Sequence, residues 1–127
     1  MSSRSLDDLL PDVAVKAKAF IASCQAAGIQ TVVACTYRTD AEQTTLYAQG
    51  RTAPGPIVTD ARAGQSLHNV RRALDVYPLV NGKLCGLSTQ AERDLWEKLG
   101  QLGEAAGFEW AGRWVHFREY PHFQIKG

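Results

Sequence analysis

The feature that most constrains the fold is the dipeptide Asn81-Gly82, which follows a run of residues suited to a β-strand. Asn-Gly between two extended segments is a strong signal for a two-residue β-hairpin. Residues 73–80 and 83–86 are therefore predicted to pair with each other. A hairpin at this place indicates an antiparallel sheet built around the middle of the chain.

Helix and strand signals alternate before this hairpin. Residues 5–28 are predicted to form a helix, because Ser5 is a suitable cap and apolar residues follow at helical spacing. The next segment, residues 29–35, is rich in β-branched residues and predicts a strand. A second helix is expected over residues 40–49, with Asp40 as its cap.

The second half of the chain continues in the same way. Residues 51–66 carry two prolines and two glycines and predict a long loop, a kind of segment that is often functional in compact domains. Thr89 and Glu92 form a capping box for a helix over residues 90–106. The aromatic-rich tail, residues 108–125, predicts short strands. This order of elements predicts an α+β fold with an antiparallel sheet flanked by helices.

Size and charge narrow the class of protein. With 127 residues, the chain is interpreted as one small domain over residues 1–127. The formal net charge of +1 gives no reason to expect a nucleic acid or an anionic membrane as partner. No run approaches the ~20 apolar residues of a membrane span, and the first ten residues lack the apolar core of a signal peptide. We therefore expect a monomer made in the cytoplasm without insertion into a membrane.

The cysteines do not suggest a disulfide framework or a cysteine zinc site. Their number is odd and their spacing is wide, at Cys24, Cys35 and Cys85. Disulfide scaffolds and cysteine zinc sites both fit this pattern poorly. We interpret all three as reduced thiols, which behave as small hydrophobic residues when they are buried.

Candidate chemistry begins with His68 and Asp75. His68 stands at the end of the predicted long loop, and Asp75 lies inside the strand predicted for residues 73–80. Because side chains alternate along a strand, Asp75 and Tyr77 should share one face. An aspartate in so apolar a strand is costly to bury without a partner, and a metal ion would be such a partner.

His122 and Glu119 form a second candidate cluster near the end of the chain. Two histidines and one carboxylate would leave a zinc position open for water, and a second carboxylate beside the metal could carry protons. The alternative is structural: the histidines are satisfied polar residues, Asp75 pairs with Arg71 or Arg72, and Glu119 is solvated. Spacing alone leaves both interpretations open.

Several separated motifs resemble one family. SLHNVRRALD at residues 66–75 resembles the SxHxxGxAxD motif of the VanY-like D-alanyl-D-alanine carboxypeptidase family, and EYPHFQ at residues 119–124 is similar to its (D/E)xPHFQ motif. TYRT at residues 36–39 resembles the family's GYRS turn, residues 42–52 its EQ…LYAQGRT helix, and residues 110–114 its WGGxW stretch. Motifs in the right order are far more specific than any single one.

The resemblance covers about residues 28–125. Residues 1–27 precede it and are expected to form an additional N-terminal helix. Within the family, the chain is most similar to phage endolysins that act as L-alanyl-D-glutamate peptidases. The resemblance implies a zinc site in a cleft on the sheet, with three zinc ligands: His68, Asp75 and His122. It also implies that Glu119 is the catalytic carboxylate, that Arg38 binds a substrate carboxylate or polarises the scissile carbonyl, and that Ser66 lies near the substrate.

The function implied is that of a zinc metallopeptidase acting on the peptide stem of bacterial peptidoglycan, at the L-alanyl-D-glutamate bond. Such an enzyme would reach the cell wall, in the periplasm of a host, after release. Two alternatives remain: a D-alanyl-D-alanine carboxypeptidase or dipeptidase with the same site, and a non-catalytic module that binds cell-wall peptide.

The sequence departs from the family pattern at two positions. Arg71 replaces the motif glycine and is expected to tilt the loop or to reach into the cleft. Glu119 stands where many of these endolysins carry aspartate. His116 matches no ligand of the family, and we interpret it as a structural or rim residue. Most of the aromatic residues here are expected in the core, and one or two are expected to wall the cleft. The set consists of Trp96, Trp110, Trp114, Phe117, Tyr120 and Phe123.

Overall fold

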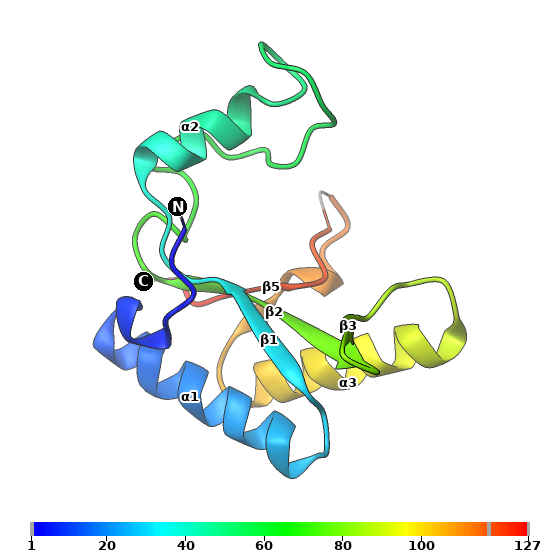
Figure 1. The fold of residues 1–127 in the computed structure, drawn as a ribbon. Coiled ribbons are helices and arrows are strands. Elements are labelled where there is room, and N and C mark those ends of the chain that lie inside the picture. Colours follow the sequence, from blue (N-terminus) through cyan, green and yellow to red (C-terminus); the bar gives the residue numbers. More distant parts are fainter. Residues whose placement is uncertain (1, 117, 127) are drawn as a thin grey trace.

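The computed structural model describes residues 2–116 and 118–126. The sheet has five strands in the order β1-β2-β5-β4, with β3 paired to β2 off this path, and the pairings are antiparallel. Helices α1 and α3 lie side by side along one side of the sheet, whereas α2 stands apart on the other side (Figure 1). The predicted α+β class, with an antiparallel sheet flanked by helices, is confirmed.

The bounds of the elements are as follows. The helices are α1 (Pro11–Ala26), α2 (Asp40–Ala48) and α3 (Gln90–Ala105), with 3-10 turns η1 (Leu6–Asp8) and η2 (Ala111–Arg113). The strands are β1 (Thr31–Cys35), β2 (Ala73–Val80), β3 (Lys83–Leu84), β4 (Glu109–Trp110) and β5 (His122–Gln124).

The hairpin forms where it was predicted, although its second strand, β3, ends at Leu84 and not at residue 86. Val80 pairs with Lys83, and the two turn residues take left-handed backbone angles, with φ of 53° at Asn81 and 77° at Gly82. These angles are the ones that a two-residue hairpin turn requires. Strand β2 has the predicted bounds, and the turn therefore fixes how β3 returns along it.

The N-terminal helix differs from the prediction. Ser5 caps only the short η1, where its Oγ accepts from the backbone N–H of Asp7 at 3.2 Å. The chain is then extended at Leu10, and α1 begins at Pro11. Proline disfavours a helical conformation in the residue before it and is well suited to the first helical position. The predicted single helix over residues 5–28 is thus broken by Pro11.

The other helix starts rest on capping boxes. Thr39, rather than the predicted Asp40, caps α2, because its side chain and that of Glu42 satisfy each other's backbone N–H groups. The predicted capping box of Thr89 and Glu92 opens α3 in the same way. Each box satisfies donors that a helix start otherwise leaves unpaired.

The core lies between the sheet and helices α1 and α3. It includes Phe20 from α1, Leu99 from α3, and Leu74 and Phe123 from the sheet. Gly100 and Gly103 let α3 approach closely: a Cβ added at Gly103 would stand 2.4 Å from the ring of Phe123. This packing covers one face of β2 and β5 and leaves their other face for the site.

Two further expectations concern the whole chain. The three cysteines are free and buried, in agreement with their interpretation as apolar thiols. Over the residues described, none of the helices combines the length and the apolar character needed to cross a membrane.

Candidate active site

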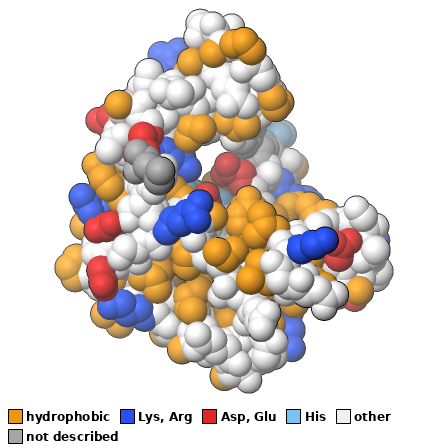
Figure 2. Space-filling view, in the orientation of Figure 1, with side chains coloured by type: hydrophobic (Ala, Val, Ile, Leu, Met, Phe, Trp, Pro, Cys, Tyr) orange, Lys and Arg blue, Asp and Glu red, His pale blue; other side chains and the backbone are white. Residues whose placement is uncertain are grey.

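A cavity of about 900 Å³ opens over the uncovered face of the sheet. Figure 2 shows the surface hollowed between the segment that carries α2 and the rest of the molecule. The lining comes from the long loop before β2, from β2 and β5, and from the chain between η2 and β5. All six residues singled out from the sequence line it: Arg38, Ser66, His68, Asp75, Glu119 and His122.

Asp75 stands at the centre of the site because of the strand register. Its Cα is paired with that of Cys35 in β1 on one side and with that of His122 in β5 on the other. His68 arrives from the loop before β2. The Oδ1 atom of Asp75 lies 3.1 Å from Nε2 of His68 and 3.3 Å from Nδ1 of His122. The structure therefore brings His122, 47 residues further along the chain than Asp75, to the same oxygen that His68 contacts.

Each histidine has an acceptor at its other ring nitrogen. Nδ1 of His68 lies 2.9 Å from the backbone oxygen of Thr36. Nε2 of His122 lies 2.8 Å from Oε1 of Gln124. Because both acceptors are oxygens, these nitrogens carry the protons, and the nitrogens that face Asp75 present lone pairs when the rings are neutral. Both rings are also almost fully buried, which holds their orientation.

Electrostatics bind this group together. Burial opposes ionisation of Asp75, but hydrogen bonds from His122 and His68 outweigh it and hold its pKa well below the usual range. Burial likewise disfavours a charged His68, yet the contacts with Asp75 and Cys35 raise its pKa to about 10. In the absence of a metal ion, a protonated His68 therefore pairs with an ionised Asp75.

Glu119 lies in the same cavity in a different environment. Burial, and then the negative charge of Asp75, raise its pKa above the usual value, while His122 and other cations act in the opposite direction. A carboxyl group whose pKa is raised in this way holds a proton more readily than a solvated one, which is a property of groups that transfer protons.

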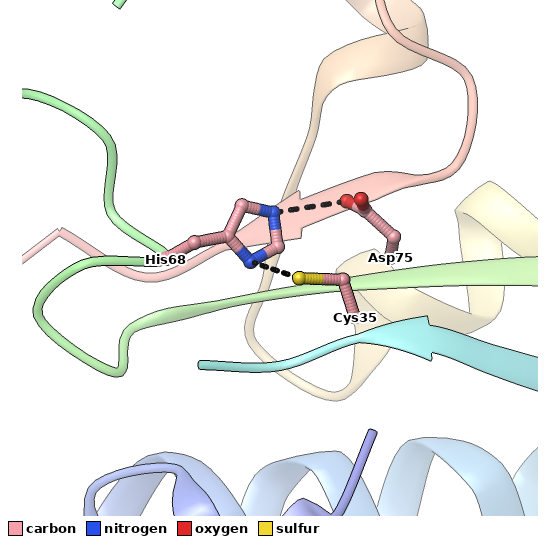
Figure 3. Close-up of side chains that lie close together, drawn as sticks. All are labelled: Cys35, His68 and Asp75. Atoms are coloured by element: carbon pink, nitrogen blue, oxygen red, sulfur yellow. Dashed lines mark hydrogen bonds and ion pairs between the residues drawn. The ribbon is translucent and has the colours of Figure 1, made fainter. Parts of the chain in front are cut away.

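Cys35 is a site residue that the sequence reasoning missed. Its Sγ lies 3.6 Å from Nδ1 of His68, and Cys35, His68 and Asp75 offer potential metal-ligand atoms that all lie within 4.8 Å of one another. Figure 3 shows the thiol and the carboxylate at opposite nitrogens of the imidazole. The available signal was the end of the predicted strand at residue 35, directly before the TYRT turn, but the register with β2 was not predictable.

Arg38 is held at the cavity wall by its neighbours. One terminal nitrogen of its guanidinium donates to Oε1 of Gln43 at 2.8 Å, and the other contacts Sγ of Cys35 at 3.6 Å. Ser66 accepts from the backbone N–H of His68 at 3.2 Å through its Oγ, which helps to shape the loop that presents this histidine. Both residues therefore occupy positions that a bound substrate could reach.

Arg71 does not reach into the cleft. Its backbone keeps the left-handed conformation that the motif glycine would adopt, with φ of 64°. Its guanidinium stacks 3.9 Å from the ring centre of Tyr37 and donates to the backbone oxygen of Asp8 at 2.9 Å. The expectation of a side chain in the cleft is therefore wrong: the contacts with Tyr37 and Asp8 hold the strained residue in place.

The remaining candidates divide between core and cavity. Trp110 and Phe123 are buried in the core, as expected, and Trp114 and Tyr120 line the cavity. Trp96 is buried and also reaches the cavity wall. His116 is exposed and is not among the lining residues. The remaining aromatic residue of this set, Phe117, lies outside the described residues.

Comparison with known sequences identifies a family model and a curated relative. A family model described as D-alanyl-D-alanine carboxypeptidase matches residues 59–125. Peptidoglycan L-alanyl-D-glutamate endopeptidase CwlK of Bacillus subtilis is 36% identical over 123 residues, which cover 93% of this chain and 74% of that protein.

Solved structures share the fold. The L-Ala D-Glu endopeptidase ChiX of Serratia marcescens superposes with a TM-score of 0.69 at 18% identity, over 99% of this chain and 89% of that one. The vancomycin resistance D,D-pentapeptidase VanY, as an E175A mutant in complex with Zn(II), gives a TM-score of 0.68 at 16% identity, over 94% and 73% of the two chains. The sequence matches go further than the fold: this chain is a peptidase of the VanY-like D-alanyl-D-alanine carboxypeptidase family, as its motifs predict.

Proposed function

We propose that this chain is a zinc-dependent endopeptidase that hydrolyses the L-alanyl-D-glutamate bond in the stem peptide of bacterial peptidoglycan. The observation that carries the proposal is the convergence of His68 and His122 on one oxygen of Asp75 in the wall of the cavity. The choice of bond follows from the 36% identity to CwlK, which is named for this activity.

The separations of the two histidines from Asp75 fit a zinc ion. Nitrogen and carboxylate ligands bind zinc at ~2.0–2.2 Å, so two ligand atoms of a tetrahedral site lie roughly 3.3 Å apart. The separations from Asp75 Oδ1, 3.1 Å to His68 and 3.3 Å to His122, match this spacing. Three protein ligands leave the fourth position for water or substrate, which is the arrangement of catalytic zinc sites.

Cys35 is the competing third ligand, because its thiol lies within 4.8 Å of ligand atoms of both His68 and Asp75. The direction of the ring nitrogens favours His122. The thiol lies at Nδ1 of His68, whereas Asp75 lies at Nε2 on the other side of the ring. One imidazole nitrogen binds one ion, so a site shared with Asp75 uses Nε2, the nitrogen that faces away from the thiol. His122 contacts the same Asp75 oxygen and completes the set.

Glu119 is assigned the proton transfers. Zinc, when bound, supplies a Lewis acid that polarises the scissile carbonyl and lowers the pKa of water. Glu119 is half-buried in the cavity, and the raised pKa of its carboxyl suits it to take a proton from the attacking water and to return it to the departing amine. This assignment gives one residue both proton-transfer steps.

Arg38 and Ser66 are assigned to the substrate. The guanidinium of Arg38 is oriented by Gln43 and carries a fixed positive charge at the cavity wall. Such a group binds a carboxylate or stabilises a carbonyl oxygen on which negative charge develops. Stem peptides carry free carboxylates, which fits a cavity that Arg118 and Lys126 also line.

A second candidate is removal of the terminal D-alanine by carboxypeptidase action. The family model that matches residues 59–125 carries that description, and the same site could perform it. The two candidates share zinc, Glu119 and the cavity, and differ in the bond that is cut.

The test is digestion of purified peptidoglycan by the zinc-loaded enzyme, with mass spectrometry of the soluble products and labelling of new amino termini. We expect new D-glutamyl termini with wild-type protein and none with His122→Ala. Free D-alanine as the sole product would replace the proposal with the carboxypeptidase. No new terminus of either kind from zinc-loaded protein would contradict both candidates.

A further inference from the structure

A chain of hydrogen bonds leads from His122 to a carboxylate outside the group of candidate ligands. Gln124 is buried, with 6% of its surface exposed, and lies two residues after His122 in β5, so both side chains point to the same face. Its Oε1 faces Nε2 of His122 at 2.8 Å, and its Nε2 donates to Oε1 of Glu109 at 3.2 Å. Glu109 and Gln124 are paired across β4 and β5, which sets this contact.

The other oxygen of Glu109 is also engaged. Its Oε2 accepts from the indole N–H of Trp114 at 2.8 Å. Burial disfavours ionisation, but the hydrogen bonds from Trp114 and Gln124, together with Lys126, lower the pKa of Glu109. The group is therefore an ionised carboxylate, which accepts hydrogen bonds and donates none.

We propose that Glu109 and Gln124 are positioning residues, which set the direction of this hydrogen-bond chain and thereby hold the proton of His122 on Nε2. The proposal rests on the zinc site proposed above. An ionised Glu109 requires the NH₂ group of Gln124 to face it, so the amide oxygen must face His122. That oxygen requires an N–H at Nε2, which leaves the lone pair of a neutral ring on Nδ1, the nitrogen that faces Asp75.

The two histidines reach the same state by different means. The N–H of His68 faces the backbone oxygen of Thr36. This oxygen can only accept a hydrogen bond. Gln124 can reverse, because its amide offers an acceptor at one end and a donor at the other. Without a fixed group beyond it, the amide could turn and donate to Nε2, which would move the proton to Nδ1 and block metal binding there. Glu109 prevents this reversal.

The experiment is a set of substitutions read out by zinc affinity. In Glu109→Gln, residue 109 can donate as well as accept, so the direction of the chain is no longer fixed. We expect zinc to bind roughly 10–100-fold more weakly, the usual effect of losing a partner of a metal-bound histidine. Chelator competition at fixed pH measures the zinc affinity of each variant. Glu104→Gln is the matched control, since Glu104 pairs with Arg113.

A double variant separates direction from mere packing. Exchanging the two groups, Glu109→Gln with Gln124→Glu, rebuilds the chain: residue 109 can accept from Trp114 and donate to residue 124, whose carboxylate accepts from His122. Zinc affinity should return to within a few-fold of wild type. The proposal is overturned if Glu109→Gln binds zinc as tightly as Glu104→Gln does, or if the exchange does not improve on Glu109→Gln while both variants remain folded.

The zinc-affinity measurements do not depend on which bond the enzyme cuts. If wild-type protein binds zinc but does not cut the L-alanyl-D-glutamate bond, the proposed function fails, and the affinity measurements still decide the role of Glu109. If the enzyme cuts that bond and Glu109→Gln leaves zinc affinity unchanged, the positioning role alone fails.

Discussion

Around Asp75, the position of a neighbouring side chain decides whether it can share a metal ion with this aspartate. His122 and Cys35 both flank this aspartate across the sheet, but only His122 directs a ring nitrogen at the oxygen that His68 also contacts. Cys35 instead contacts the far nitrogen of His68 and the guanidinium of Arg38. At the residue scale, the direction of a lone pair separates a proposed metal ligand from its neighbour.

This distinction predicts opposite results for two substitutions. His122→Ala should weaken zinc binding by more than the roughly 10–100-fold that follows loss of an outer partner, because it removes a ligand. Cys35→Ser should bind zinc within that range of wild type. Elemental analysis and chelator competition measure both variants. Loss of zinc from Cys35→Ser, with zinc retained by His122→Ala, would assign the metal to Cys35, His68 and Asp75.

A second prediction concerns Glu119. Glu119→Gln keeps the size of the side chain but removes the proton acceptor, so kcat should fall by at least ~10²-fold. Zinc content and the unfolding midpoint should stay near the wild-type values, because Glu119 is proposed to carry protons and not to bind the metal. Steady-state kinetics on a stem peptide give the rate. A variant that cleaves at nearly the wild-type rate would assign the proton to another group, and one that loses zinc would make Glu119 a ligand.

At the scale of elements, the site depends on how closely α3 packs on the sheet. Two glycines of this helix face large rings: Gly100 faces Trp110, and Gly103 faces Phe123. Phe123 follows His122 directly in β5 and stacks on Trp110 in β4. The helix therefore supports, from beneath, the two strands that carry His122, Gln124 and Glu109.

Gly103→Ala tests this support. The added methyl would meet the ring of Phe123, 2.4 Å away, and overpacking of this kind typically costs ~1–3 kcal/mol of folding free energy. Any displacement of Phe123 should also weaken zinc binding through His122. Gln101→Ala, at an exposed position of the same helix, is the control and should change stability little. Urea unfolding measures both; equal stability of the two variants would show that α3 can move away without cost.

For the molecule as a whole, protons and zinc compete for the same site. The pKa of His68 is raised from 6.5 to about 10 in the metal-free protein, chiefly by Asp75 and Cys35 against the effect of burial. This contribution to stability is fully present below pH 6.5 and is lost as the pH rises towards 10. The lowered pKa of Asp75 acts at the acid end: its contribution is present above pH 3.8 and is lost below it.

The expected pH dependence has two parts. With a chelator present, the Tm should fall between pH 6.5 and 9, because the stabilising contribution of His68 is progressively lost. With saturating zinc, the Tm should exceed that of the metal-free protein by an amount that grows across the same pH range, because metal binding requires a neutral histidine. Thermal unfolding at several pH values measures both, and His68→Ala isolates the contribution of this residue from other groups that titrate. A zinc increment that does not change with pH would contradict this account.

Much of the fold is determined by interactions between close neighbours in the sequence. The Asn81-Gly82 turn, the capping box of Thr89 and Glu92, and the bounds of β2 were predictable because each depends on residues within a few positions of one another. The break at Pro11 is equally local, and the prediction of one continuous helix there was wrong because Pro11 disfavours a helical conformation at Leu10.

The tertiary structure alone decided which residues meet at the site. The motifs named His68, Asp75, His122, Glu119, Arg38 and Ser66, and the structure shows that all of them line one cavity, while their roles remain predictions. Cys35 beside His68 depends on the register of β1 against β2, and Glu109 beside Gln124 on that of β4 against β5. The direction of the Arg71 side chain depends on η1. Contacts between distant segments depend on register and packing, which no local pattern specifies.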